Sequence, residues 1–307
     1  MLADLHLHFE GSVPRETLLL LARKNGHAFG IAGAFETALA RSRRAGSFLR
    51  LFADCCRVFQ SPEDYAEAAR AIGRELGGQL RHAEIYISPE IWARFGLDRS
   101  AVLAAIDGAL SEAENETGGR SLLLLDSVRQ WGSEAADRVL DFFEEHPLER
   151  IVGFGIGGDE SSVPARQFRK VYDRARRLGL STAIHAGEWA GADSVAEALG
   201  ELSPNRIDHG VRAVENPRLL GRLARSGVTL CVAPSSNLAT GVSESWKAHP
   251  LPQLLDAGVS VCLSADDPTI FGTTTTEEYR LARAKMKITA EAIEEMQNCA
   301  WRARFGK

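Results

Sequence analysis

The stretch Thr182-Ala183-Ile184-His185-Ala186-Gly187-Glu188 lies near the middle of the chain and predicts a buried β-strand with a histidine at its end. Its apolar residues favour a strand, and Gly187 permits a turn that brings the Glu188 carboxylate to the same space as the His185 imidazole. Such a pair either binds a metal ion or is a satisfied polar pair that caps the following helix. His185 and Glu188 are therefore both candidate metal ligands, and the other strands decide between these interpretations.

Strands of the same kind recur on both sides of this stretch and alternate with helical segments. The predicted strands are 3–8, 81–89, 122–126, 151–156, 181–185, 206–209, 228–232 and 259–264, and the helical segments include 135–143, 165–178, 194–199, 217–226 and 252–257. Near-continuous apolar strands separated by amphipathic helices are typical of a parallel sheet covered on both faces. These eight strands favour an α/β fold of the closed (β/α)8 TIM-barrel type over an open doubly wound sheet. No Gly-x-Gly-x-x-Gly follows the first strand to mark a dinucleotide fold.

The 307 residues are expected to form a single domain, 1–307, with a helical insertion after the first strand at 12–80. Within this insertion, Phe48 and Phe52 belong to a segment with large apolar groups at helical spacing. Core packing explains them simply, and the alternative is an apolar wall or lid over a pocket.

Composition restricts the partners and the compartment. The formal net charge is −5 and no long run of Lys and Arg is present, so neither nucleic acid nor an anionic membrane is expected as a partner. The five cysteines have no CxxC spacing, which argues against a disulfide framework and a thiolate zinc site. Reduced thiols, with neither a secretory signal nor a membrane span in the sequence, predict a cytoplasmic enzyme.

Polar side chains gather where four of the predicted strands end, which is where a barrel of this kind holds its site. They are His6, His8, His185, Glu188, Asp208, His209, Asp266 and Asp267. Three histidines and one aspartate around a divalent cation, with a position left for water, form the ligand set of a catalytic zinc site. The segment 153–160 contains no lysine that could bridge two metal ions after carbamylation, so one metal ion is expected.

Four motifs, in this order, resemble the adenosine deaminase family of the amidohydrolase superfamily, which contains metal-dependent purine deaminases. They are His6-Leu7-His8-Phe9-Glu10-Gly11, His185-Ala186-Gly187-Glu188, Asp208-His209-Gly210 and Ser264-Ala265-Asp266-Asp267-Pro268. The likeness extends from the first strand to beyond Phe271. It implies a hydrolase that acts on the C–N bond of a cyclic amidine and deaminates a 6-aminopurine nucleoside, adenosine or deoxyadenosine first.

The resemblance also implies roles for individual residues. The ligands of one Zn²⁺ per chain would be His6, His8, His185 and Asp266. Glu188 would donate a proton to N1 of the purine, and His209 would orient the attacking water and help to deprotonate it. The remaining substrate contacts would come from Asp267 to N7, the Gly158 backbone to N3, and, in the lid and around the 5′ position, Phe48, Phe52 and Glu10.

Two departures from the family pattern bear on the substrate. Adenosine-specific members carry an aspartate for the ribose 5′-hydroxyl where this chain has Glu10, and Gly157-Gly158 replaces a more usual Ala-Gly. Adenine and aminodeoxyfutalosine, a menaquinone precursor, are therefore alternative substrates. A more distant alternative is hydrolysis of an amide, lactam or phosphoester, against which Asp267 and the glycine-rich fourth strand argue because they suit a flat heterocycle.

Other polar residues are predicted to be structural. Ser235-Ser236-Asn237 follows the seventh strand and is expected to shape the pocket rim. His82 and His249 are expected to be packing or hydrogen-bonding histidines, and Glu84 fits either a structural or a functional role.

Overall fold

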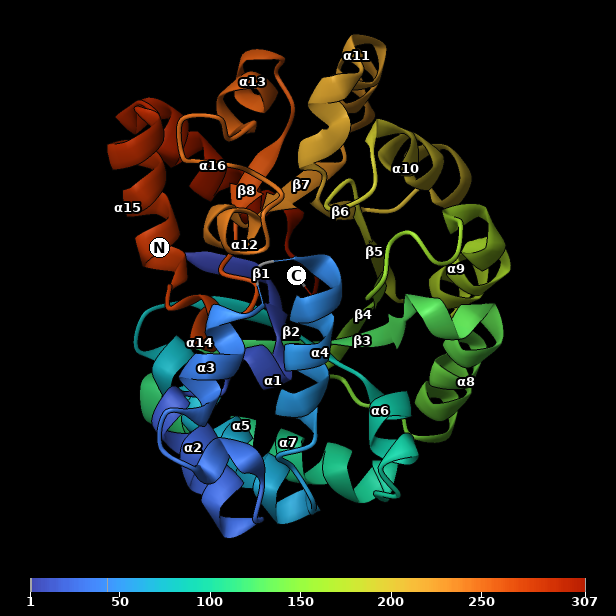
Figure 1. Cartoon of the computed structure of the whole chain (residues 1–307). Coiled ribbons are helices and arrows are strands. Elements are labelled where there is room, and N and C mark those ends of the chain that lie inside the picture. Colours follow the sequence, from blue (N-terminus) through green and yellow to red (C-terminus); the bar gives the residue numbers. More distant parts are fainter. Residues whose placement is uncertain (1, 43, 307) are drawn as a thin grey trace.

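The computed structural model describes residues 2–42 and 44–306 and contains a sheet of eight parallel strands in the order β1 to β8 (Figure 1). The strands are β1 Ala3–His8, β2 His82–Ile87, β3 Arg120–Val128, β4 Ile151–Gly157, β5 Ser181–Ala186, β6 Arg206–His209, β7 Thr229–Val232 and β8 Val261–Leu263. Beyond β8, the His8 amide donates to the Asp266 carbonyl (3.0 Å) and the Asp266 amide donates to the His6 carbonyl (3.1 Å). The ring is thereby nearly closed, which confirms the predicted barrel.

Helices follow the strands and surround the barrel (Figure 1). They are α6 Pro89–Arg94, α7 Arg99–Thr117, α8 Gly132–Glu145, α9 Arg169–Arg177, α10 Ala192–Glu197, α11 Pro217–Ser226, α12 Pro234–Ala239, α13 Leu251–Asp256, α14 Pro268–Phe271, α15 Thr275–Met286 and α16 Ala290–Ala303. Shorter 3-10 or π turns occupy Ala28–Gly30, Arg129–Trp131, Ala165–Phe168, Ala198–Leu202 and Val211–Glu215. Among the described helices, none is both long and apolar enough to cross a membrane.

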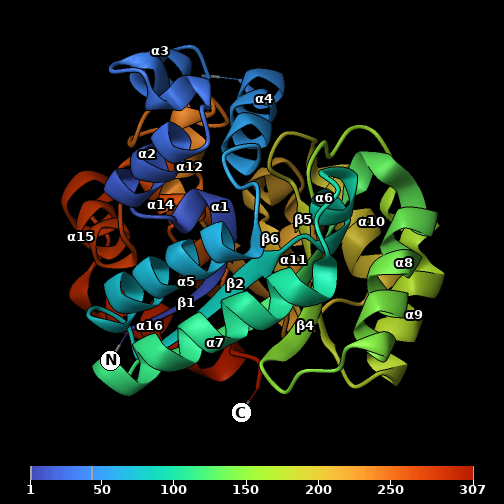
Figure 2. The ribbon, with the colours of Figure 1, turned by 90° about the horizontal axis from the view of Figure 1, so that it is seen from below.

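The segment between β1 and β2 is helical, as predicted for 12–80. It contains α1 Phe9–Ser12, α2 Arg15–Lys24, α3 Ala34–Ala40, α4 Ala45–Cys56 and α5 Pro62–Gly77. Figure 2 shows α2, α3 and α4 gathered at one end of the molecule, whereas α5 lies along α7. These two helices approach closely because Gly73 faces Ala113, and a Cβ atom on Gly73 would lie 2.6 Å from the Ala113 Cβ.

Helix α7 was not among the helical segments named from the sequence, although both of its ends carry ordinary signals. The Asp98 carboxylate accepts from the amides of Ser100 (2.9 Å) and Ala101 (3.2 Å) and caps the first turn. Gly118, with φ of +72°, ends the helix in the left-handed conformation that glycine adopts without strain. The buried face of α7, from Val102 to Ala113, has the period of an amphipathic helix.

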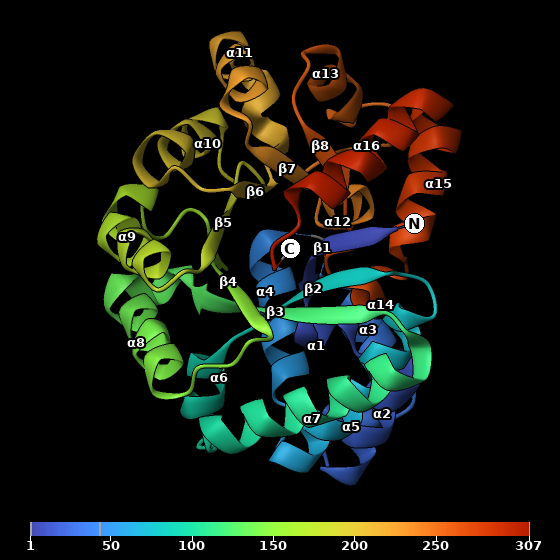
Figure 3. The ribbon, with the colours of Figure 1, turned by 180° about the vertical axis from the view of Figure 1, so that it is seen from behind.

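The C-terminal segment lies at the amino end of the barrel, seen from behind in Figure 3. A buried ion pair between Arg206 and Glu84 fills the same end. The Arg206 guanidinium lies 2.5 Å from the Glu84 carboxylate, and both side chains are completely buried. Glu84 also contacts the His82 ring (2.9 Å) and accepts from the Phe305 amide (2.6 Å). His82 therefore has the hydrogen-bonding role predicted for it, and Glu84 belongs to the structural end of the barrel.

Candidate active site

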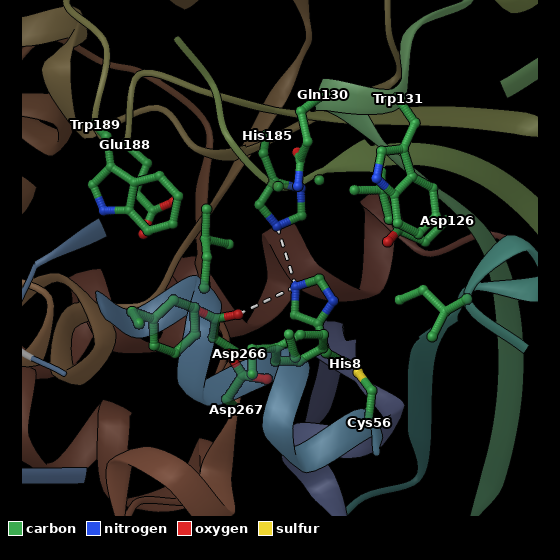
Figure 4. A pocket seen from close by; sticks show the side chains of 18 of the residues that line it. His8, Cys56, Asp126, Gln130, Trp131, His185, Glu188, Trp189, Asp266 and Asp267 are labelled. Atoms are coloured by element: carbon green, nitrogen blue, oxygen red, sulfur yellow. Dashed lines mark hydrogen bonds and ion pairs between the residues drawn. The ribbon is translucent and has the colours of Figure 1, made fainter. Parts of the chain in front are cut away.

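The polar residues predicted at the strand ends come together at the opposite end of the barrel. Figure 4 shows His8, His185, Glu188, Asp266 and Asp267 among them. β1 supplies His6 and His8, β5 supplies His185, β6 ends at His209, and Asp266 follows β8. His209 (φ 61°) and Asp266 (φ 63°) adopt the left-handed conformation, which costs a non-glycine residue about 1–3 kcal/mol. The surrounding structure must hold both residues in place, and such strain is concentrated at functional sites.

The four residues predicted as metal ligands converge on one point. The Nε2 atom of His6 lies 3.3 Å from that of His8 and 3.0 Å from that of His185, and the latter two are 3.2 Å apart. The Asp266 Oδ1 atom lies 3.3 Å from His6 Nε2 and 3.4 Å from His8 Nε2. Ligands about 2.0–2.1 Å from a tetrahedral Zn²⁺ are about 3.3 Å apart, so these spacings fit such an ion.

A second set that includes His209 is also close. Ligand atoms of His6, His185, His209 and Asp266 all lie within 4.8 Å of one another. The His8 Nε2 atom lies 3.2–3.4 Å from the ligand atoms of His6, His185 and Asp266, whereas the His209 Nε2 atom lies 3.8 Å from the Asp266 Oδ2 atom. Distance alone therefore favours His8 as the ligand but leaves His209 within reach of the same centre.

The protonation of the site also suits a cation. Burial lowers the pKa of His8 to about 3 and holds the pKa values of His6 and His185 below the usual range, so their rings are neutral and can bind a metal. The His185 Nδ1 atom lies 3.1 Å from the Ile156 carbonyl, which fixes its proton on Nδ1 and leaves a lone pair on Nε2. Burial raises the pKa of Asp266 to about 7, which a bound cation would reverse.

Glu188 is buried beside this cluster. Its Oε2 atom lies 3.6 Å from the Nε2 atom of His209. Burial, followed by the charges of Asp266, Glu160 and Asp267, raises the pKa of Glu188 well above its usual range. A carboxyl group in this environment retains its proton at neutral pH and can donate it to a substrate nitrogen.

Glu160 holds the loop that carries Glu188, a role that the sequence did not reveal. Its carboxylate accepts from the amides of Glu188 (3.0 Å), Trp189 (2.8 Å) and Ala190 (2.9 Å) and also from that of Gly187. The Ser194 hydroxyl donates to it as well. A buried carboxylate with this many donors fixes the backbone of the whole turn after β5.

Replacing Glu160 with glutamine is expected to disturb this loop, because an amide oxygen accepts fewer hydrogen bonds and the amide NH₂ repels the backbone donors. We expect the protein to lose roughly 1.5–3 kcal/mol of stability and kcat to fall by up to about 100-fold. Thermal unfolding and steady-state kinetics measure the two effects. The neighbouring Asp159→Asn is the control, since within residues 2–42 and 44–306 the hydrogen bonds to the Asp159 carboxylate come from the amide and hydroxyl of Ser161. Equal behaviour of the two variants would contradict the role given to Glu160.

A cavity of about 300 Å³ opens above the cluster, at the lower end of the range for small-molecule sites. Of the predicted substrate contacts, Phe48, Phe52, Gly158 and Asp267 line it. In Figure 4, His8, His185 and Asp266 lie at its centre, with Glu188 and Trp189 on one side and Asp126 and Trp131 on the other. The predicted apolar wall is thus present, with α4 supplying its two phenylalanines.

Two glycines make room for this arrangement. A Cβ atom on Gly11 would lie 1.7 Å from the Asp267 carboxylate, so the glycine after Glu10 allows Asp267 to occupy its position. Gly158 has φ of +101°, and a Cβ atom there would lie 2.5 Å from the Gln130 side-chain oxygen. A side chain at either Gly11 or Gly158 would therefore collide with a neighbouring side chain, which explains why glycine occupies both positions.

Glu10 and Asp126 differ from the sequence expectation. Glu10 is 2% exposed and is not among the residues that line the cavity, and burial raises its pKa to about 7. Asp126, at the end of the apolar run of β3, does line the cavity, and Ser88 donates to its carboxyl group (2.9 Å). Its position at a strand end was the signal that could have identified Asp126.

Known proteins resemble the chain over nearly its whole length. The family model described as "Adenosine deaminase" matches residues 2–306. A protein named adenine deaminase from Chelativorans sp. (strain BNC1) is 36% identical over 310 residues, which cover 99% of this chain and 93% of the relative. The crystal structure of adenine deaminase from Arthrobacter aurescens has a TM-score of 0.92 and 29% identity, covering 99% of this chain and 93% of that one. An amidohydrolase from Burkholderia ambifaria, solved with bound Zn, shares the fold with a TM-score of 0.92 at 24% identity, covering 99% and 85% of the two chains.

Proposed function

The chain belongs to the adenosine deaminase family, whose members are hydrolases that act on C–N bonds, and on that premise we propose that it deaminates adenine. The observation that supports adenine most directly is the full-length similarity, at 34–36% identity, to proteins named adenine deaminase. Adenosine, the first expectation from the sequence, is the less well supported member of the same substrate class.

The outer wall of the cavity also favours a free base over a nucleoside. It is formed by aromatic and aliphatic side chains, among them Phe48, Leu49, Phe52, Ile91, Phe95 and Trp131. The polar side chains at its edge each have a partner: Arg57 pairs with Asp54 (2.7 Å), Arg94 stacks on the Trp131 ring (3.8 Å), and the Gln130 side-chain oxygen accepts from the Asp159 amide (2.9 Å). A ribose would place much of its polar surface against the apolar part of this wall, which is unfavourable.

Asp126 adds a contact that suits the free base. Adenine has an imidazole N–H that its nucleoside lacks, and this donor needs an acceptor in a closed pocket. The Asp126 carboxyl group lies across the cavity from Glu188 (Figure 4). We assign it to the substrate as an acceptor, in addition to the contacts proposed for Asp267 and Gly158.

His6, His8, His185 and Asp266 would hold one Zn²⁺, which supplies an activated water at neutral pH when bound. Glu188 then donates its proton to N1 of the purine ring, which makes C6 more electrophilic. Asp267 and the Gly158 backbone hold the ring through N7 and N3. His209, next to both Glu188 and Asp266, orients the attacking oxygen. Phe48 and Phe52 exclude solvent water from the reacting face.

Purified protein is expected to deaminate adenine with a kcat/KM at least about 100-fold above that for adenosine, because the nucleoside would place much of its polar surface against the apolar part of the wall. Adenine, adenosine, deoxyadenosine and aminodeoxyfutalosine are compared by loss of the 6-amino chromophore and by ammonia release. The Glu188→Gln protein, prepared in parallel, shows whether the turnover belongs to this site. Equal or faster turnover of adenosine would reject the preference for the free base.

A further inference from the structure

A chain of hydrogen bonds runs from a backbone amide to His209 through two residues that the proposed function does not use. The Leu251 amide donates to His249 Nδ1 (3.1 Å), and His249 Nε2 lies 3.1 Å from Asn237 Oδ1. The Asn237 Nδ2 atom lies 3.2 Å from His209 Nδ1. The exposed fractions of the His249, Asn237 and His209 side chains are 2%, 0% and 1%, so solvent does not compete for these bonds.

The direction of every bond in this chain follows from its first donor. A backbone N–H can only donate, so His249 Nδ1 has the lone pair and the ring proton lies on Nε2. That proton is donated to the Asn237 oxygen, which turns the amide nitrogen toward His209. The amide N–H then donates to His209 Nδ1, and the proton of the neutral His209 ring lies on Nε2. Burial lowers the pKa of His249 to about 4, which keeps this ring neutral.

His185 shows the opposite arrangement. Its Nδ1 atom faces the Ile156 carbonyl, which only accepts, so its proton lies on Nδ1 and its lone pair faces the metal cluster. His209 Nδ1 faces a donor instead. The two rings border the same centre, yet one offers it a lone pair and the other offers it an N–H. The ligand atoms of His185 and His209 both belong to a group within 4.8 Å, so distance does not show which of the two rings binds the metal. The direction of the hydrogen bond at Nδ1 does distinguish the two rings.

We propose that Asn237 and His249 are positioning residues that hold His209 as its Nε2–H tautomer, so that it donates a hydrogen bond into the reaction centre and stays outside the metal ligand set. Two carboxyl oxygens lie near this nitrogen, Glu188 Oε2 at 3.6 Å and Asp266 Oδ2 at 3.8 Å, both beyond hydrogen-bonding distance. The tautomer assignment does not depend on the proposed function. Only the catalytic role of this N–H donor rests on it. It changes the expectation for His209 from a proton acceptor to a donor that orients the attacking oxygen.

The test is a measurement of the His209 tautomer by NMR of ¹⁵N-histidine-labelled, zinc-loaded protein. The nitrogen that bears the proton and the nitrogen with the lone pair differ strongly in ¹⁵N shift, and loss of signals in His209→Gln assigns this ring among the eight histidines. In the unmodified protein we expect the proton on Nε2. In Asn237→Asp we expect it on Nδ1, because a carboxylate only accepts and bonds both His209 and His249. Asn115→Asp, the same change at an exposed helical position, should leave the spectrum unchanged.

Kinetics and metal content complete the test. Losing one preorganised donor should lower kcat of Asn237→Asp by roughly 10²–10³-fold, with little change in KM and with one metal ion still bound per chain. His249→Gln retains a donor toward Asn237 and should keep the Nε2–H tautomer, whereas His249→Leu should produce a mixture. If Asn237→Asp does not fold, the difference in His209 tautomer between His249→Gln and His249→Leu provides the test instead.

A proton on His209 Nδ1 in the unmodified protein, or an unchanged tautomer in both Asn237→Asp and His249→Leu, would overturn the proposal. The NMR and metal measurements need no substrate. Failure of the adenine assay would therefore count against the proposed function and leave the tautomer result intact.

Discussion

Glu188→Gln is expected to lower kcat for adenine by on the order of 10²–10⁴-fold while the protein keeps its metal ion. Glutamine preserves the shape of the side chain but cannot supply the proton that N1 requires. Glu188 lies outside the four residues with the shortest mutual distances, so the metal cluster is left intact. Steady-state kinetics and elemental analysis of the same preparation measure the two quantities.

The matched control is Glu145→Gln, which makes the same chemical change at an exposed position near the end of α8. It should retain full activity. A Glu188→Gln protein with near-normal kcat would show that the proton comes from another group. Loss of metal together with activity would show that Glu188 is a ligand, which was the first interpretation of its position beside His185.

His6→Asn is expected to lose both the metal and the activity. The His6 Nε2 atom lies within 3.3 Å of the ligand atoms of His8, His185 and Asp266, so its loss removes a contact with every other member of the set. Loss of an outer hydrogen-bond partner of a ligand costs roughly 10- to 100-fold in metal affinity, and loss of the ligand itself should exceed about 100-fold. Metal content and activity after dialysis against a chelator measure this change.

The metal should also stabilise the folded protein, because the ligands meet only when the barrel is closed. Removing it from the unmodified protein should lower Tm, and added Zn²⁺ should restore both Tm and activity. His146→Asn, at an exposed position after α8, is the control. If His6→Asn bound metal with normal affinity, the ligand assignment would be wrong.

The barrel and the gathering of polar side chains at its mouth were predictable because both depend on local patterns. An apolar strand can be recognised from a few consecutive residues, and the polar side chain that follows it must lie at the carboxyl end of the sheet. His6, His8, His185 and Asp266 each follow this rule, and their distances agree with the predicted set. The order of the four motifs then identified the family.

The roles of Glu160 and Asn237 were not predictable, because their partners come from segments after other strands. His249 has the hydrogen-bonding role predicted for it, but its partner Asn237 could not be named from the sequence. Glu160 lies beyond β4, and only the folded course of the turn after β5 brings four backbone amides to its carboxylate. Asn237 and His249 meet because the segment after α12 returns to the barrel mouth. The path of a loop depends on tertiary packing, for which periodicity gives no signal.

Glu10 is the predicted substrate contact that does not line the cavity. Alternation along β1 places His6 and His8 correctly, but the chain turns into α1 at Phe9, and the rule for side-chain direction changes from a strand to a helix. Glu10 is buried and does not line the cavity, and Asp267 occupies the space beside Gly11.

The bonds between the first strand and the segment after the last one also constrain how a new chain folds. On the ribosome, β1 is made first, and one of its edges remains unpaired until β8 and Asp266 have been synthesised. An unpaired strand edge can pair with another chain, and parallel sheets with distant partners form slowly. The chain is thus open to such pairing in the interval between the synthesis of these two segments, and the interval ends in the same event that brings the proposed metal ligands together.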